Sequence, residues 1–387
     1  MQRIWSFDDG VVIDCDYPGG NIIVEKREGE RMYLAQDLRD TEGNWFSWSF
    51  RVRGAAGRRL EFCFTNGDVI GARGPACSVD GGERWDWLGL ATVAGPSFRF
   101  DFSSGHGEVM FCMTIPYLER DLQDFLARHH GDEAVRCDSL CLTEGGRKAE
   151  VLHAGRLDGN PRHRLLLTAR HHCCESLASY ALEGIVESAL GTDRLGEWYR
   201  ANVEIMAVPF MDKDGVEQGD QGKNRRPHDH NRDYGKDSIY TTVTALKRLV
   251  PEWSNGNLRI ALDPHCPYLK GGATNEAIYF VGGKNRANWE RVCDFSEVLE
   301  ECQRGPLRYA ALNNLAFGRG WNTASNYDGG KSCGAWTSEL PGISFGTTIE
   351  IPYANADGQE VNAGSARLFG RDLARAIRIY LEAARIG

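Results

Sequence analysis

The fold is decided by the stretch Leu165-Leu166-Leu167-Thr168-Ala169-Arg170-His171-His172-Cys173-Cys174-Glu175. Its first five residues form a short and almost wholly apolar run, which is typical of a strand covered on both faces. A helical pattern from about Glu175 to Leu190 follows the run directly. A buried strand that leads at once into a helix indicates an α/β domain.

The same alternation continues toward the C-terminus. Residues 237–249 have a helical pattern, and residues 258–262 form a second short apolar run that predicts another buried strand. Residues 366–384 predict an amphipathic helix. Its apolar face is expected to carry Leu368, Leu373, Ile377 and Leu381.

The N-terminal part of the chain has a different pattern. Aromatic and polar residues alternate over residues 45–52 and 60–64, and glycine-rich turns separate these runs. A period of two with frequent turns predicts an antiparallel β-sandwich. Helical spacing begins only with residues 118–126. We therefore expect a β-sandwich over residues 1–117, and an α/β domain with a mixed central sheet flanked by helices over residues 118–387.

Composition limits the classes of function. The chain has 387 residues, a formal net charge of −9 and 12 cysteines. Nucleic-acid binding needs a basic surface and a bilayer span needs about 20 consecutive apolar residues, so neither partner is expected. The acidic start lacks the features of a signal peptide, which favours the cytoplasm and reduced cysteines. The oligomeric state cannot be read from the sequence.

Candidate metal ligands follow the two predicted buried strands. His172 and Glu175 follow the first strand at a spacing of three, and His265 follows the second. Side chains at the carboxyl ends of neighbouring strands can meet at one site. Two histidines and a glutamate form an open catalytic zinc set, although a lone histidine is more often structural. Asp263 is either a supporting carboxylate for His265 or a residue of the strand-end turn.

Two further segments carry polar groups that such a site would need. The stretch 214–234 is rich in Arg, Lys, Asn and His, which suits recognition of a carboxylate but also an exposed loop. Glu350 is a single acid within an apolar run over residues 345–353. It is either buried and acts as a general base beside zinc-bound water, or lies on the exposed face of an edge strand.

The order of these segments resembles the zinc metallocarboxypeptidases, most closely their cytosolic-carboxypeptidase-like branch, over nearly the whole chain. Residues 44–52 look like the Trp-Phe…Phe-Arg-Val signature of the branch, and Ile115-Pro116-Tyr117 resembles its domain junction. The remaining matches are Ala169–Glu175 for Ala-Arg-x-His-Pro-Gly-Glu, Asp229–Arg232 for Asp-Leu-Asn-Arg, Asp263-Pro264-His265 for the second histidine segment, and Thr348-Ile349-Glu350 for the glutamate segment.

The resemblance implies a role for each matched residue. His172, Glu175 and His265 would bind Zn²⁺, and Glu350 would be the general base and then the proton donor. Asn231 and Arg232 would hold the terminal carboxylate of a peptide or protein substrate, and Tyr327 would cap it. The implied activity is hydrolysis of the C-terminal peptide bond.

The chain also departs from the family pattern. The family's oxyanion arginine falls on Gly222, so Lys223, Arg225 or Arg226 would supply the charge, and Arg225 is favoured here. Cys173 and Cys174 replace Pro-Gly. An amidase or deacylase, a hydrolase of peptidoglycan peptides and an inactive binding protein remain as alternatives. For the released residue, Lys331 would suit an acidic side chain and Trp336 a bulky apolar one.

Overall fold

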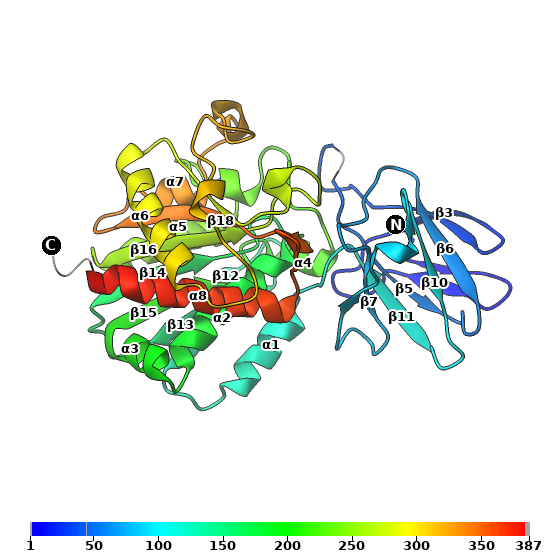
Figure 1. Cartoon of the computed structure of the whole chain (residues 1–387), viewed down its shortest axis with the longest axis horizontal. Helices are drawn as coiled ribbons and strands as arrows, with labels where there is room; N and C mark the ends of the chain where they lie inside the picture. The colour runs from blue at the N-terminus through cyan, green and yellow to red at the C-terminus, as the bar shows by residue number, and fades with distance from the viewer. Residues whose placement is uncertain (1, 44, 384–387) are drawn as a thin grey trace.

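The computed structural model describes residues 2–43 and 45–383. It consists of two packed β-sheets at the N-terminal end and a larger α/β part that contains the rest of the chain (Figure 1). Asn44 in the Trp-Phe signature and Ala384 in the predicted C-terminal helix lie outside the described residues. In the described part of the chain, no helix is long and apolar enough to cross a membrane.

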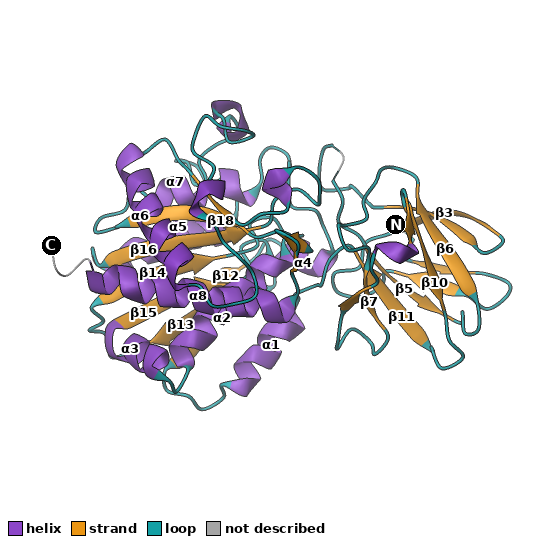
Figure 2. Cartoon of the chain, viewed as in Figure 1, coloured by secondary structure: helices purple, strands orange, loops and turns teal. Residues whose placement is uncertain are grey.

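The N-terminal part is a sandwich of two sheets, seen on the right of Figure 2. The first sheet has the order β1 (Ile4–Ser6), β2 (Val12–Asp14), β5 (Ser49–Arg53), β11 (Glu108–Cys112), β7 (Ala76–Ser78), β8 (Asp86–Trp87). The second has the order β3 (Ile23–Glu28), β4 (Arg31–Ala35), β6 (Arg59–Phe64), β10 (Ser97–Asp101), β9 (Val93–Ala94), with the 3₁₀ turn η1 at Leu90–Thr92.

Aromatic side chains fill the space between the two sheets. In β6, Leu60, Phe62 and Phe64 are buried and alternate with more exposed residues, as a period of two requires. The ring of Phe62 lies 5.1 Å from that of Phe50 and 5.4 Å from that of Phe111, which come from the opposite sheet. The predicted alternation therefore supplies the core of the sandwich.

The expectation of a wholly antiparallel sandwich is wrong for one pair of strands. Strands β4 and β6 are parallel, whereas the other strand pairs of the two sheets are antiparallel. A parallel pair needs a long connection, and residues 36–58 provide one by contributing β5 to the other sheet. The strand expected over residues 45–52 also begins only at Ser49, because Ser47 instead pairs with the second domain.

The larger part is built on a seven-stranded mixed sheet. Its order is β12 (Val135–Leu142), β13 (Lys148–Gly155), β15 (Val203–Val208), β14 (His163–Thr168), β16 (Leu258–His265), β18 (Phe345–Glu350), β17 (Tyr279–Val281). Strands β15, β14, β16 and β18 are mutually parallel, and the outer strands are antiparallel to their neighbours. A small hairpin follows, formed by β19 (Asn355–Ala356) and β20 (Gln359–Glu360).

Helices cover both faces of this sheet. The helices are α1 (Glu119–Arg128), α2 (Ser176–Leu190), α3 (Arg194–Asn202), α4 (Lys213–Gln218), α5 (Thr241–Ser254), α6 (Arg286–Cys302), α7 (Cys333–Thr337) and α8 (Ala363–Ala383). The 3₁₀ turns are η2 (His230–Arg232), η3 (Ala273–Asn275), η4 (Ala311–Asn313) and η5 (Ala324–Tyr327). In β14, Leu165 and Leu167 join the core under α2 and α8, whereas Leu166 joins the core under α5. The apolar run is thus covered on both faces, as expected.

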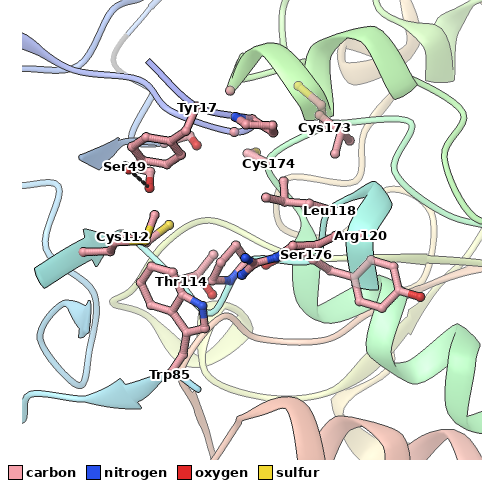
Figure 3. A pocket seen from close by; sticks show the side chains of 18 of the residues that line it. Tyr17, Ser49, Trp85, Cys112, Thr114, Leu118, Arg120, Cys173, Cys174 and Ser176 are labelled. Atoms are coloured by element: carbon pink, nitrogen blue, oxygen red, sulfur yellow. Dashed lines mark hydrogen bonds between the residues drawn. The ribbon is translucent and has the colours of Figure 1, made fainter. Parts of the chain in front are cut away.

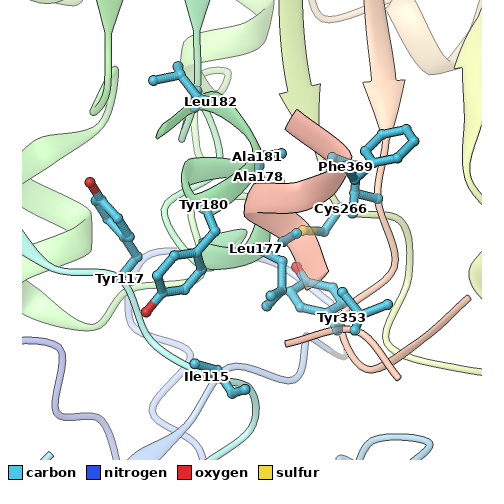
Figure 4. Close-up of a cluster of buried hydrophobic side chains, with 14 of the residues drawn as sticks. Ile115, Tyr117, Leu177, Ala178, Tyr180, Ala181, Leu182, Cys266, Tyr353 and Phe369 are labelled. Atoms are coloured by element: carbon cyan, nitrogen blue, oxygen red, sulfur yellow. The ribbon is translucent and has the colours of Figure 1, made fainter. Parts of the chain in front are cut away.

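One residue of the predicted C-terminal helix face is misplaced. Leu373, Ile377 and Leu381 of α8 are buried, but Leu368 is 48% exposed. The first three repeat every four residues and share one face of the helix, whereas Leu368 is five residues before Leu373 and lies on another face. Phe369, labelled in Figure 4, occupies the buried position instead.

The two parts of the chain meet along a polar seam. The last strand of the sandwich ends at Cys112, and α1 begins at Glu119. Between them, the carbonyl oxygens of Ile115 and Pro116 accept hydrogen bonds from Ser176 and Tyr180 of α2, each at 2.6 Å. A cavity of about 170 Å³ remains between the domains (Figure 3).

The division at residue 117 stays a prediction. All twelve cysteines lie within the described residues and are free, and seven of them are buried.

Helices α2 and α8 cross at a close contact that requires glycine. A Cβ atom on Gly370 would lie 2.1 Å from the carbonyl oxygen of Ala181, and one on Gly184 would lie 2.1 Å from that of Arg367. Both obstacles are backbone atoms, which cannot move aside cheaply. The two glycines therefore set the distance between the helices.

Replacing Gly370 should reverse the usual effect of a glycine-to-alanine change in a helix. Such a change ordinarily stabilises a helix by about 1 kcal/mol. We expect Gly370→Ala to lower the free energy of unfolding by about 2 kcal/mol or more because of overpacking. Gly364→Ala in the same helix is the control, since Gly364 is exposed and a Cβ atom there would meet only the Asn362 side chain, at 3.4 Å. Equal urea midpoints for the two variants would contradict this account.

Candidate metal centre

The parallel order of three strands brings the candidate residues to one edge of the sheet. Strands β14, β16 and β18 are adjacent, so their carboxyl ends lie side by side. His265 and Glu350 are partners in the register of β16 and β18. His172 and Glu175 follow β14 in the turn that leads into α2.

A buried arginine shapes that turn. Arg170 has a φ of 62°, which is uncommon for a residue other than glycine. Its guanidinium donates hydrogen bonds to the carbonyl oxygens of Cys173, at 2.9 Å, and Tyr117, at 2.7 Å. These bonds support the unusual backbone conformation. They also hold the segment that carries His172 against the domain junction.

Two imidazoles and one carboxylate converge on a single point. His172 Nδ1 lies 3.0 Å from Glu175 Oε1, His265 Nδ1 lies 2.8 Å from Glu175 Oε2, and the two Nδ1 atoms are 3.2 Å apart. The Glu175 carboxylate is fully buried, with an imidazole nitrogen close to each of its two oxygen atoms. This donor set of two nitrogens and one carboxylate suits a divalent cation of the zinc type.

Each imidazole has a carboxylate behind it. Nε2 of His265 is 2.8 Å from Asp263 Oδ2, and Nε2 of His172 is 3.6 Å from Asp229 Oδ2. A carboxylate on the far nitrogen of a histidine ligand fixes its orientation and raises its basicity. Asp263 therefore occupies the supporting position that the sequence left open. Asp229 belongs to the Asp229–Arg232 motif, from which the sequence predicts a role only for Asn231 and Arg232.

A second group of possible ligands lies behind the first and shares His265. It consists of His171, Asp263 and His265. Asp263 Oδ1 is 2.8 Å from His171 Nδ1 and accepts a hydrogen bond from Thr168, and His171 Nε2 is 2.7 Å from the Tyr234 hydroxyl. These groups already satisfy one another, and His171 and Asp263 do not line the cavity described next. We interpret them as support for His265.

The first group opens on a cavity of about 530 Å³. The cavity is lined by the candidate residues His172, Glu175, Asn231, Arg232, His265, Tyr327 and Glu350. Glu350 is buried, and its Oε2 atom has no hydrogen-bond partner in the described part of the chain. Burial, reinforced by the nearby Glu175 carboxylate, raises the pKa of Glu350. The predicted alternative, a glutamate on the exposed face of an edge strand, is wrong.

Lys223 places a cation in this cavity, directly beside the candidate ligands. Its Nζ atom lies 2.5 Å from Glu175 Oε1 and donates to the carbonyl oxygen of Cys266 at 3.2 Å. Burial opposes ionisation of Glu175, yet Lys223 and the two imidazoles hold its pKa well below the usual range. The same pairing outweighs burial at Lys223 and raises the pKa of its ammonium group.

The preference for Arg225 over Lys223 is not supported by the placement of the two side chains. Arg225 does not line the cavity. Its guanidinium instead contacts the carboxylates of Asp40 at 3.1 Å, Asp212 at 2.9 Å and Asp220 at 3.0 Å. Three buried or nearly buried acids hold the arginine away from the cavity, and one of them, Asp40, is 185 residues away in sequence.

The expected substrate-binding residues lie on the cavity wall. The Asn231 amide lies 3.3 Å from His265 Nε2 and accepts a hydrogen bond from the Cys333 backbone. Arg232 donates to the carbonyl oxygen of Asn326 at 3.0 Å, and its guanidinium lies 5.1 Å from the Tyr327 ring. The hydroxyl of Tyr327 donates to Asn322.

A second cavity of about 350 Å³ adjoins the first and shares Val281, Tyr327, Ser332 and Thr348 with it. Lys331 lines this second cavity, with its ammonium group 2.5 Å from Glu339. Trp336 lines neither cavity and packs against Tyr234 at 5.2 Å between ring centroids. Of the two residues suggested for selecting the released side chain, Lys331 lines a cavity and Trp336 does not.

Comparison with known proteins gives distant relatives. No protein-family model matches the chain. An uncharacterised protein of Zymomonas mobilis is 26% identical over 230 residues, which is 58% of this chain and 59% of that protein. Cytosolic carboxypeptidase 6 of Caenorhabditis elegans is 28% identical over 169 residues, 41% of this chain and 36% of that protein. The chain thus matches less than two thirds of the length of either relative.

Solved structures match almost the whole fold. A metallo-carboxypeptidase from Burkholderia cenocepacia has a TM-score of 0.77 at 18% identity and covers 96% of this chain and 99% of its own. A metallo-carboxypeptidase from Pseudomonas aeruginosa, in complex with (2-guanidinoethylmercapto)succinic acid, has a TM-score of 0.72 at 20% identity and covers 96% and 99%. The two-part architecture is therefore a known fold.

Removing His265 should remove the metal. The variant His265→Ala loses one of three ligands, so we expect its affinity for Zn²⁺ to fall by more than about tenfold. Elemental analysis of the purified protein after dialysis against dilute zinc measures this loss. His130→Ala is the control, because His130 is exposed and outside the cavity. Equal metal content in both variants would exclude His265 as a ligand.

A second histidine should make stability depend on pH. Burial lowers the pKa of His230 to about 4, although Asp212 opposes this, and its ring stacks on Tyr240 at 3.6 Å. Between pH 6.5 and 4 the unfolded chain binds a proton that the folded chain does not, so stability falls as pH falls. Wild type should lose about 2 kcal/mol more than His230→Phe between pH 7 and 5. Urea unfolding at both pH values measures this, and equal losses would refute it.

Proposed function

We propose that this chain, which belongs to the metallocarboxypeptidase family and is related to its cytosolic carboxypeptidases, hydrolyses the C-terminal peptide bond of a peptide or protein. The observation that carries the proposal is the convergence of His172, Glu175 and His265 beside a cavity with a buried Glu350. These three residues would hold a zinc ion, which their donor atoms suit.

The bound zinc would polarise the scissile carbonyl and lower the pKa of its water to about 7. Glu350 would take a proton from the attacking water at its carboxylate and return it to the leaving amine nitrogen. Its burial supports this role, as does its Oε2 atom, which has no hydrogen-bond partner among the described residues and is free to accept a proton. Register pairing with His265 keeps it next to the proposed ligands.

The other residues of the cavity would orient the substrate. Asn231 and Arg232 would bind the terminal carboxylate, so that only the last peptide bond reaches the metal. Tyr327 lies over Arg232 and would close on the bound residue. Lys223, rather than Arg225, would stabilise the negative charge that develops on the scissile carbonyl oxygen, since its ammonium is the one that lines the cavity.

The remaining expectations follow from the same proposal. The substrate would be a peptide or protein C-terminus, in the cytoplasm, with neither nucleic acid nor membrane as a partner. The name of the relatives, cytosolic carboxypeptidase, supports this location. An amidase, a hydrolase of peptidoglycan peptides and an inactive binding protein are the alternatives that the following experiment separates.

The proposal predicts a requirement for a free C-terminus. Zinc-loaded protein should release the last residue from peptides with a free carboxylate, and amidation of the same peptides should abolish release. Equal cleavage of both forms would point to an amidase, and cleavage of neither form, nor of a stem peptide, to a binding protein. Mass spectrometry of a random peptide library identifies the products.

The general base can be tested on the same peptides. Glu350→Gln keeps the shape of the side chain but cannot accept the proton, so kcat should fall by a factor of at least about 100. Its zinc content should stay at the wild-type level, because Glu350 is not one of the three ligands. Leu312→Ala, at a residue 87% exposed and outside the cavity, is the control. Near wild-type turnover by Glu350→Gln would overturn the assignment.

A further inference from the structure

The segment that carries Lys223 has little structure of its own. Residues 219–229, between α4 and η2, contain no helix or strand. Gly222 in this segment has a φ of 79°, and a Cβ atom there would lie 2.4 Å from the Cys173 backbone nitrogen. The segment is therefore pressed against the turn that bears the proposed ligands. Its other side is covered by a second surface.

The sandwich domain supplies that surface through residues 37–47. The carboxylate of Asp40 accepts hydrogen bonds from the backbone N–H groups of Gln221, at 3.1 Å, and Gly222, at 2.9 Å. It also accepts one from Arg225 Nε at 3.1 Å. One side chain of the sandwich thus accepts three hydrogen bonds, two from residues that precede Lys223 and one from a residue that follows it.

Neighbouring residues of the same sandwich segment extend this contact. The buried Gln221 amide donates to the carbonyl oxygen of Ser47 at 2.8 Å and accepts from its N–H at 2.6 Å. Arg39 pairs with Asp220 at 2.5 Å. The hydroxyl of Thr41 donates to the carbonyl oxygen of Lys223 itself. The backbone of Lys223 is therefore bound by the sandwich on both flanks.

The side chain of Lys223 is also in contact with the sandwich. The Trp45 ring lies 5.5 Å from the Lys223 ammonium group, and Trp45 is the one residue in the described part of the sandwich that lines the cavity. The same ammonium group also contacts the Glu175 carboxylate and the carbonyl oxygen of Cys266, which belong to the α/β domain. Lys223 thus spans the seam, with its backbone held by one domain and its charge placed in the other.

The geometry points to a role for the sandwich domain in catalysis: its segment 37–47, chiefly through Asp40, positions Lys223 in the cavity. Asp40 does not line the cavity and acts through Lys223, so it is a positioning residue. The catalytic part of this inference rests on the proposed function. The alternative is an ordinary domain contact that contributes stability alone.

Hydrogen exchange tests the positioning without any turnover. In Asp40→Ala, the peptide that contains Gln221 and Gly222 should exchange its backbone N–H groups at least tenfold faster than in wild type. Arg73→Ala is the control, since Arg73 donates to Asn355 and Gly358 across the same seam but far from Lys223 in sequence. Unchanged exchange in that peptide of Asp40→Ala would overturn the inference.

A double-mutant comparison tests the consequence for catalysis. If Asp40 acts through Lys223, Asp40→Ala should lower kcat about tenfold or more with a smaller change in KM, and adding it to Lys223→Ala should lower kcat less than about twofold further. Arg73→Ala should leave kcat unchanged. A loss in the double variant equal to the product of the two single losses would indicate a merely structural role and contradict the inference.

Two measures keep the test decisive. Asp40→Asn retains one acceptor and the shape of the side chain, so an intermediate effect on exchange and on kcat is expected even if Asp40→Ala folds poorly. Full wild-type exchange and kcat in Asp40→Asn together with wild-type kcat in Asp40→Ala would refute the role of Asp40. If wild type cleaves no peptide, the proposed function fails, whereas the exchange experiment still judges the positioning.

Discussion

The buried carboxylate of Glu175 is the constraint on which the rest of the site depends. A charge that is fully buried is very unfavourable unless other charges and hydrogen bonds compensate it. Here His172, His265 and Lys223 approach the same two oxygen atoms. Each compensating group comes from a different part of the chain, so the carboxylate can be buried only in the fully folded protein.

The central sheet provides two of these three groups. Parallel pairing of β14, β16 and β18 aligns their carboxyl ends, which places His172, His265 and Glu350 around one point. Packing fixes this alignment from both faces, because the residues of β14 point alternately under α2 and under α5. Further carboxylates, those of Asp263 and Asp229, then orient the imidazoles from behind. The precision of the site is thus a property of the sheet and its core.

The third group, Lys223, comes from a segment that the sheet does not hold. Its position depends on the sandwich domain, which offers Asp40, Ser47 and Trp45 to residues 220–225. This arrangement explains why Trp45 and Ser47 are not part of a strand, although their alternation predicts one. Their polar and aromatic groups contact the α/β domain instead. The same polar contacts pack the sandwich directly against the α/β domain.

The sequence by itself determined the local elements and the residue types of the site. The apolar runs and helical spacings predicted β14, α2, α5, β16 and most of α8, because burial of a strand or helix face imposes a period that a single sequence displays. Tertiary structure alone decided the parallel pairing of β4 with β6 and the placement of Lys223, rather than Arg225, in the cavity. These depend on partners far apart in the chain: Arg225 is held by Asp40, which precedes it by 185 residues. No local pattern indicates such a contact. Whether Arg225 lies in the cavity or binds the three acids is decided only when the domains pack.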